Sequence, residues 1–105
     1  MPKQALESLT ETMFYVLMAL YGESKCGIDI AAWIEGKTAG RCRLGPATLY
    51  TILAKFQEEG LIVETAVEGR KRTYAITERG RALFRQELSR LKLCVLDGDR
   101  EGDGL

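Results

Sequence analysis

Residues 46–59 constrain the fold more than any other segment, because the start, the two faces and the end of one helix can all be predicted there. Gly45 suits the N-cap, and Pro46 suits the first helical position, where a missing N–H leaves no partner unsatisfied. Gly60 supplies the left-handed residue that commonly follows a helix. Helical spacing places the apolar residues of this segment on one face: Leu49, Ile52, Leu53 and Phe56.

The opposite face of this predicted helix carries short or hydroxylated side chains and one cation. It comprises Ala47, Thr48, Thr51 and Lys55, with Tyr50 at its border. Small side chains let a helix enter the major groove of DNA, where threonine and lysine reach bases and phosphates. An ordinary amphipathic helix with a solvated polar face has the same pattern. The helix alone therefore leaves DNA recognition and simple solvent exposure as alternatives.

A basic β-hairpin is predicted directly after Gly60. Residues 61–67 are rich in β-branched side chains, a Glu-Gly turn follows, and 70–76 form the return strand. The return strand begins with three cations, Arg70, Lys71 and Arg72, which repel one another unless an anion such as a phosphate backbone lies across them. A charged edge that prevents sheet-to-sheet aggregation is the alternative. Because the hairpin follows a candidate recognition helix, the order of these elements along the chain is that of a winged helix-turn-helix.

Three further helices are predicted, at 10–21, 27–35 and 77–96. For the first helix, Ser8 with Glu11 matches a capping box, and Thr10 is an equally suitable N-cap. The second helix, a loop at 36–40 and the helix at 46–59 form the helix-turn-helix. The predicted fold is therefore mainly α with a small β-hairpin: a winged helix-turn-helix plus a C-terminal dimerisation helix.

The predicted C-terminal helix carries an apolar seam with spacings of 4, 3 and 4, as in a heptad repeat: Phe84, Leu88, Leu91 and Val95. The three-helix unit and the hairpin already provide a closed core, so this helix has nothing intramolecular left to cover. We therefore expect a homodimer in which the seam meets the same helix of a second subunit. A surface helix packed on its own core is the alternative.

Charge is balanced overall but divided unevenly along the chain. Residues 1–96 carry 14 basic and 11 acidic side chains, whereas 97–105 carry one basic and four acidic ones. The Gly- and Asp-rich end has no apolar period, which is typical of disorder. The predicted organisation is a DNA-binding domain over 1–77, a dimerisation helix over 78–96 and a disordered acidic tail over 97–105.

Several function classes are disfavoured by composition. The chain has no histidine and no Gly-rich phosphate loop, so we expect no enzyme activity, cofactor or metal. Cys26, Cys42 and Cys94 are widely spaced without a Cys-x-x-Cys pair, which favours reduced cytoplasmic thiols. The longest apolar run, at 13–21, is far shorter than the roughly 20 residues that span a bilayer, so no membrane association is expected.

Five short motifs together resemble the PadR family of bacterial transcriptional regulators. They are LTET at 9–12, LGPATLY at 44–50, EEGLI at 58–62, GRKRTYAIT at 69–77 and Glu78-x-Gly80. The resemblance covers about residues 9–95. The chain is similar to the short members, which have a winged-helix domain and one C-terminal dimerisation helix and lack the larger C-terminal domain.

The resemblance implies a homodimer that binds double-stranded DNA at a roughly palindromic operator and usually represses nearby genes. By position, the recognition helix and the hairpin cations meet DNA, the latter at phosphates or in the minor groove. The full set of predicted DNA contacts is Arg43, Ala47, Thr48, Tyr50, Thr51, Lys55, Arg70, Lys71 and Arg72.

Two alternative functions remain open from the sequence. One is a small-molecule sensor, since some short family members bind flat hydrophobic molecules between subunits. Its candidate aromatic walls are Tyr15, Trp33 and Phe84, although all three are also typical core residues. The other is a protein-binding winged-helix adaptor that uses the apolar C-terminal helix and does not bind duplex DNA.

Overall fold

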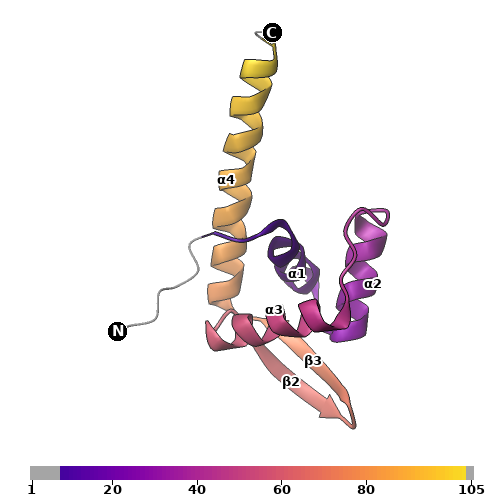
Figure 1. Cartoon of the computed structure of the whole chain (residues 1–105). Helices are drawn as coiled ribbons and strands as arrows, with labels where there is room; N and C mark the ends of the chain where they lie inside the picture. Colours follow the sequence, from indigo (N-terminus) through magenta and orange to yellow (C-terminus); the bar gives the residue numbers. More distant parts are fainter. Residues whose placement is uncertain (1–7, 104–105) are drawn as a thin grey trace.

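Residues 8–103, the part of the chain that this computed structural model describes, fold into four helices and a three-stranded antiparallel sheet (Figure 1). The elements are α1 (Glu11–Gly22), β1 (Lys25–Cys26), α2 (Gly27–Lys37), α3 (Pro46–Glu58), β2 (Ile62–Glu68), β3 (Lys71–Ile76) and α4 (Glu78–Asp103). The arrangement confirms the predicted mainly helical, winged helix-turn-helix fold with a long C-terminal helix.

Local sequence signals set the ends of α1 and α3. The Thr10 hydroxyl accepts a hydrogen bond from the Met13 N–H at 3.2 Å, so Thr10 is the N-cap of α1. Gly45 is the N-cap of α3, with Pro46 in the first turn. Gly60 then adopts a positive φ of 73°, which ends the helix as predicted.

The sheet has the strand order β1-β3-β2, and its β2–β3 hairpin is the wing. The hairpin turns at Gly69, whose φ is 61°. Its register runs from Ile62 opposite Ile76 to Glu68 opposite Lys71, with an irregularity between Glu64 and Ala66. Strand β1 was not predicted, because a two-residue strand is too short to show a period. By pairing with β3, it joins the start of α2 to the wing.

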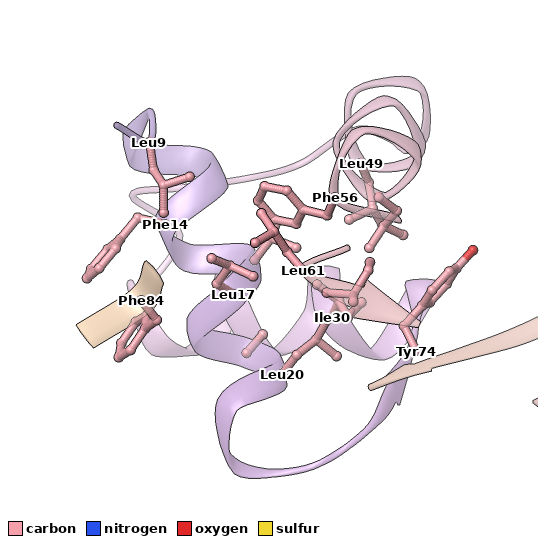
Figure 2. Close-up of a cluster of buried hydrophobic side chains, with 14 of the residues drawn as sticks. Leu9, Phe14, Leu17, Leu20, Ile30, Leu49, Phe56, Leu61, Tyr74 and Phe84 are labelled. Atoms are coloured by element: carbon pink, nitrogen blue, oxygen red, sulfur yellow. The ribbon is translucent and has the colours of Figure 1, made fainter. Parts of the chain in front are cut away.

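Helix α1 lies at the centre of the core, between α2 and α4 (Figure 1). In Figure 2, Phe14 and Phe84 lie at one end of the cluster, and Leu49 and Tyr74 lie at the other. The apolar side chains with the least exposure come from α1, α2, α3 and β2, and include Val16, Leu17, Leu20, Ile30, Ile34, Leu53, Phe56 and Ile62.

Part of the predicted dimer seam packs inside the protomer instead. Phe84 is only 8% exposed and stacks on Phe14, with ring centroids 4.9 Å apart. Leu88 and Leu91 are half-buried against the same core. The expectation that α4 has nothing intramolecular to cover was wrong, because the face of α1 that carries Phe14 is left open by α2 and α3. Of the four seam residues, Val95 is the most exposed, at 63%.

Helix α4 also extends further than predicted. It continues to Asp103, so the expectation of disorder is wrong for residues 97–103, and residues 104–105 lie outside the described part. Extending an existing helix requires no new nucleus, so weak helix formers can follow a stable one.

A buried carboxylate joins the segment before α1 to α4. Glu87 accepts a hydrogen bond from the Leu9 N–H at 2.9 Å and two from the Arg90 guanidinium, each at 3.0 Å. The hydrogen bonds from Arg90, helped by the one from Leu9, hold the pKa of Glu87 below its usual value although burial opposes this. The charged form of Glu87 is therefore favoured at neutral pH.

The first turn of α4 lies directly against the base of the wing. A Cβ at Gly80 would overlap the carbonyl oxygen of Leu61 and lie 2.7 Å from Cγ1 of Ile76. The Thr77 hydroxyl accepts from the Gly80 N–H at 3.1 Å, and the Thr77 N–H donates to the Leu61 carbonyl at 3.0 Å. Only glycine fits at this contact of α4 with the residue before β2 and the end of β3.

Two glycines of α4 provide a matched test of this packing. Gly80→Ala is expected to lower the free energy of unfolding by at least about 2–3 kcal/mol, because backbone must move to admit the methyl group. Gly98→Ala, where nothing lies within 4 Å, should raise it by roughly 0.5–1 kcal/mol through helix propensity. Urea unfolding measures both. Equal effects of the two substitutions would contradict the close contact.

Candidate nucleic-acid interface

Burial divides α3 into the two faces predicted from its periodicity. Leu49, Leu53 and Phe56 are buried in the core. Ala47, Thr48 and Thr51 are exposed on the opposite side, and the Thr51 hydroxyl donates to the Ala47 carbonyl at 2.9 Å. With Lys55, these three residues form a surface without an acidic side chain, which we call the recognition face.

The predicted DNA-binding cations near α3 and β3 are held by carboxylates of the chain. Ion pairs join Arg43 to Glu35 at 3.2 Å, Lys55 to Glu59 at 3.5 Å and Arg72 to Glu64 at 3.1 Å. Arg43 and Arg72 are exposed, and ion pairs at the surface contribute little to stability, so both side chains lie near α3 and the wing in pairs that cost little to break. The Lys55 pair differs, because Glu59 is buried.

The wing projects beyond α3 at the end of the molecule opposite to the C-terminal end of α4 (Figure 1). Its turn and the start of its return strand β3 expose Arg70, Lys71 and Arg72 to solvent. The three cations line one side of a cavity of about 350 Å³ between the wing and the start of α2, which we call the wing hollow. Its other lining residues are Cys26, Gly27, Ile28, Asp29 and Tyr50.

Tyr50 faces the start of α2 rather than lying in the middle of the recognition face. A Cβ at Gly27 would lie 2.6 Å from the Tyr50 hydroxyl oxygen, so the tyrosine packs against bare backbone there. Tyr50 remains 47% exposed. The contribution of residues 27–29 to this region is not predictable from the sequence, because no local pattern indicates which loop or wing a helix start will face.

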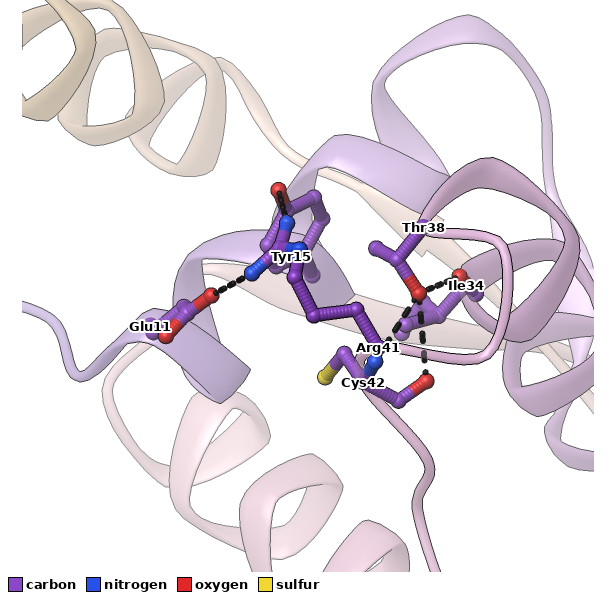
Figure 3. A network of polar contacts seen from close by, with 6 residues as sticks. All are labelled: Glu11, Tyr15, Ile34, Thr38, Arg41 and Cys42. Carbon is purple, nitrogen blue, oxygen red and sulfur yellow. Dashed lines mark hydrogen bonds and ion pairs between the residues drawn. The ribbon is translucent and has the colours of Figure 1, made fainter.

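The turn before α3 is held by a buried threonine (Figure 3). The Thr38 hydroxyl donates to the Ile34 carbonyl at 2.8 Å and accepts from the Cys42 N–H at 3.0 Å. The chain between them passes through positive φ at Ala39 and Gly40. One hydroxyl thus connects the end of α2 to the segment that leads into α3.

An arginine ties the same turn to α1. In Figure 3 the Arg41 guanidinium reaches Glu11 at 2.5 Å and the Tyr15 hydroxyl at 2.8 Å. The hydrogen bond to Glu11 is the main cause that raises the pKa of Arg41. Tyr15, predicted as a wall of an effector pocket, therefore helps to fix the path of the turn into α3.

The structure does not bring the three candidate effector residues together within one protomer. Phe84 is buried against Phe14, and Tyr15 touches the same ring edge-on with centroids 6.2 Å apart. Trp33 belongs to α2, on the other side of α1 from α4 (Figure 1). Its ring lies 5.6 Å from the Lys25 ammonium and 5.9 Å from that of Lys37.

The described residues contain neither a metal-binding cluster nor a membrane-spanning helix. Across residues 8–103, His, Cys, Asp and Glu side chains form no group of three that could hold a metal ion. No helix in this range is both long and apolar enough to cross a bilayer. Cys26 is buried, Cys42 is half-buried and Cys94 is exposed.

Comparison with known proteins identifies one matching family and several structures of similar fold. A model described as the transcriptional regulator PadR-like family matches residues 16–86. A transcriptional regulator from Clostridium thermocellum is 24% identical, with a TM-score of 0.77 over 85% of this chain and 87% of that one. H. salinarum RosR is 20% identical, with a TM-score of 0.67 over 90% of this chain and 97% of that one.

A third similar structure is Bacillus subtilis PadR in complex with operator DNA. It is 21% identical, with a TM-score of 0.64 over 72% of this chain. The match covers only 46% of the Bacillus chain. A search of functionally curated proteins found no match.

The role of the Thr38 hydroxyl in the turn can be tested by stability. Thr38→Val is expected to lower the free energy of unfolding by about 1–3 kcal/mol, because the Cys42 N–H loses its buried acceptor. Thr51→Val removes a hydroxyl from exposed α3 surface and should change stability by no more than roughly 0.5 kcal/mol. Urea denaturation compares the two. The interpretation fails if Thr38→Val is as mild as Thr51→Val.

Proposed function

The chain belongs to the PadR-like family of transcriptional regulators, and from that premise we propose that it is a repressor that binds a roughly palindromic operator as a homodimer. The observation that supports this most strongly is that α3, which carries the recognition face, and the wing, which carries the three exposed cations, lie at one end of the molecule (Figure 1). The similar Bacillus subtilis PadR has been solved with operator DNA. A chromosomal repressor of this kind would act in the cytoplasm.

In this proposal α3 enters the major groove. Ala47, Thr48 and Thr51 are exposed and short enough for close approach to base edges. Lys55 lies two turns after Ala47 and reaches the groove edge, while Arg43 precedes the helix. Because the opposite face of α3 is buried in the core, the helix is held rigidly while its recognition face stays accessible.

The wing supplies contacts that do not depend on sequence. Arg70, Lys71 and Arg72 are exposed beside α3 and suit either the phosphate backbone or a narrow minor groove. Arg72 exchanges its ion pair with Glu64 for a phosphate. Such contacts set affinity and register, whereas the recognition face sets sequence preference.

Dimerisation is proposed through the part of α4 that extends beyond the protomer core. The stripe that begins at buried Phe84 continues through half-buried Leu88 and Leu91 to Val95, which is 63% exposed. The exposure of this apolar stripe increases along α4, so its exposed end can pack against the same helix of a second subunit. A two-fold dimer then places two α3 helices on two half-sites.

A second candidate function, effector sensing, is favoured by a cavity of about 310 Å³ beside α4. It is lined by Leu9, Thr10, Glu11, Phe14, Tyr15 and Leu91. Glu11 and Tyr15 also hold Arg41 in the turn before α3. An apolar aromatic molecule bound there would disturb this turn and so couple the site to the recognition helix.

Removing the wing cations tests the proposed DNA contacts. For the Arg70→Ala, Arg72→Ala double variant, we expect affinity for any duplex to fall roughly tenfold or more at low salt, and the slope of log K against log salt to decrease by about 2. Fluorescence anisotropy titrations over a salt series measure both quantities.

The matched control for the wing variant is Lys37→Ala with Lys92→Ala, which removes two charges elsewhere and should leave the salt slope almost unchanged. Thr48→Ala with Thr51→Ala is expected to reduce preference for the operator while leaving the salt slope intact. Binding that is as tight for the wing variant as for the control would exclude the wing from the interface. Absence of salt-dependent binding by the native protein would favour the adaptor function.

A charge placed in the exposed end of the stripe tests dimerisation. Val95→Glu should convert the dimer to a folded monomer at micromolar concentration, because two carboxylates would face each other in an apolar seam. Ser89→Glu adds the same charge to an exposed position off the stripe and should leave the dimer intact. Sedimentation velocity gives the mass of each species. A native protein that is already monomeric would contradict the proposal.

A further inference from the structure

We propose that the wing hollow binds one sugar-phosphate unit of the DNA backbone, outside the groove that α3 occupies. The inference rests on the proposed DNA-binding function and adds a specific backbone site to it. It assigns a role to the start of α2, to residues Gly27, Ile28 and Asp29, which the sequence analysis did not place in any interface.

The two sides of the wing hollow match the two parts of a backbone nucleotide. One side presents the cations Arg70, Lys71 and Arg72, which suit a phosphodiester charge. The other side presents the aliphatic side chain of Ile28 and the ring of Tyr50. A deoxyribose can pack its apolar face against such a wall, whereas an inorganic anion has no apolar surface to place there.

The exposure of Ile28 supports this assignment. Its side chain is 78% exposed, the highest value among the exposed large apolar residues of the described chain. The residue lines the wing hollow together with three cations, Arg70, Lys71 and Arg72. Contact with a sugar removes this apolar surface from water when DNA binds.

Tyr50 connects the wing hollow to the recognition face. Because Gly27 has no side chain, the tyrosine hydroxyl approaches the backbone of α2 closely, and the ring forms a wall of the hollow. The residue belongs to α3, so a nucleotide held against its ring lies at the edge of the groove that α3 enters. Tyr50 therefore positions the backbone instead of reading a base.

Asp29 is expected to affect folding and DNA binding in opposite directions. Its exposed carboxylate lines the wing hollow and stands in the first turn of α2, where it stabilises the helix through the dipole. A phosphate in the hollow is repelled by the same carboxylate. Neutralising Asp29 should therefore weaken the fold slightly and strengthen DNA binding, two effects that a purely structural residue would not combine.

The test uses the full chain and a fluorescently labelled duplex of about 30 base pairs with arbitrary sequence, since backbone contacts need no operator. Asp29→Asn is expected to bind roughly threefold to tenfold more tightly than the native protein at low salt. Its urea midpoint should be equal to or below the native value. Glu101→Gln makes the same charge change at the far end of α4 and should leave the affinity within about twofold.

A second pair of variants tests the apolar wall. Ile28→Ser is expected to bind the duplex at least about threefold more weakly, because it removes the apolar side chain, whereas Ile28→Val keeps most of the apolar surface and should lose much less affinity. Both substitutions lie at an exposed position, so folding is preserved and can be verified by circular dichroism. A loss confined to the serine variant supports contact with the sugar.

The outcomes separate this inference from the proposed function. If the native protein binds no duplex at low salt, the proposed function fails and the backbone site with it. If the native protein binds and Asp29→Asn and Ile28→Ser behave like Glu101→Gln, only the backbone site is overturned. A competition experiment with inorganic phosphate gives a third outcome. If phosphate displaces DNA much more effectively than chloride at equal ionic strength, and Ile28→Ser does not change this displacement, the hollow is a site for a free anion and the backbone site is overturned.

Discussion

The arrangement of the whole molecule depends on the close contact between α4 and the base of the wing at Gly80. The Leu61 carbonyl receives the Thr77 N–H, while the Leu61 N–H donates to the Phe56 carbonyl at the end of α3. The end of α3, the start of β2 and the start of α4 thus meet at one junction without room for a side chain at position 80. The recognition face, the wing and the long helix consequently hold fixed positions relative to one another, which a dimeric DNA-binding protein needs if its two recognition helices are to match two half-sites.

Local charge arrangement suits moderate rather than maximal affinity for a DNA backbone. Several cations near α3 and the wing are paired with carboxylates of the chain, as Arg72 is with Glu64. Asp29 adds a negative charge inside the wing hollow. Backbone contacts supply most non-specific binding, so in the proposed complex carboxylates near them would lower affinity for arbitrary sequence and leave discrimination to the recognition face. The turn fixed by Thr38 and Arg41 holds that face at a defined angle to α1.

How far the sequence predicts this structure depends on whether a signal is local. Helix α3 was predicted closely, because Pro46, Gly60 and the apolar period act within the helix itself. The packing of Phe84 was missed, since it depends on which face of α1 the other helices leave open. The wing hollow was missed as well, because its walls come from the start of α2, from Tyr50 and from β3, and only the tertiary fold brings them together. Helix α4 was predicted too short, because composition alone does not show that an existing helix will be extended.

The central claim is that two copies of this chain bind a two-fold symmetric DNA site. Footprinting of the purified protein on the DNA upstream of its own gene, at near-physiological salt, tests it most directly. The expected result is a protected region with two half-sites whose centres are about one helical turn, or a multiple of it, apart. Protection of neither this DNA nor any control fragment, even at low salt, would contradict it.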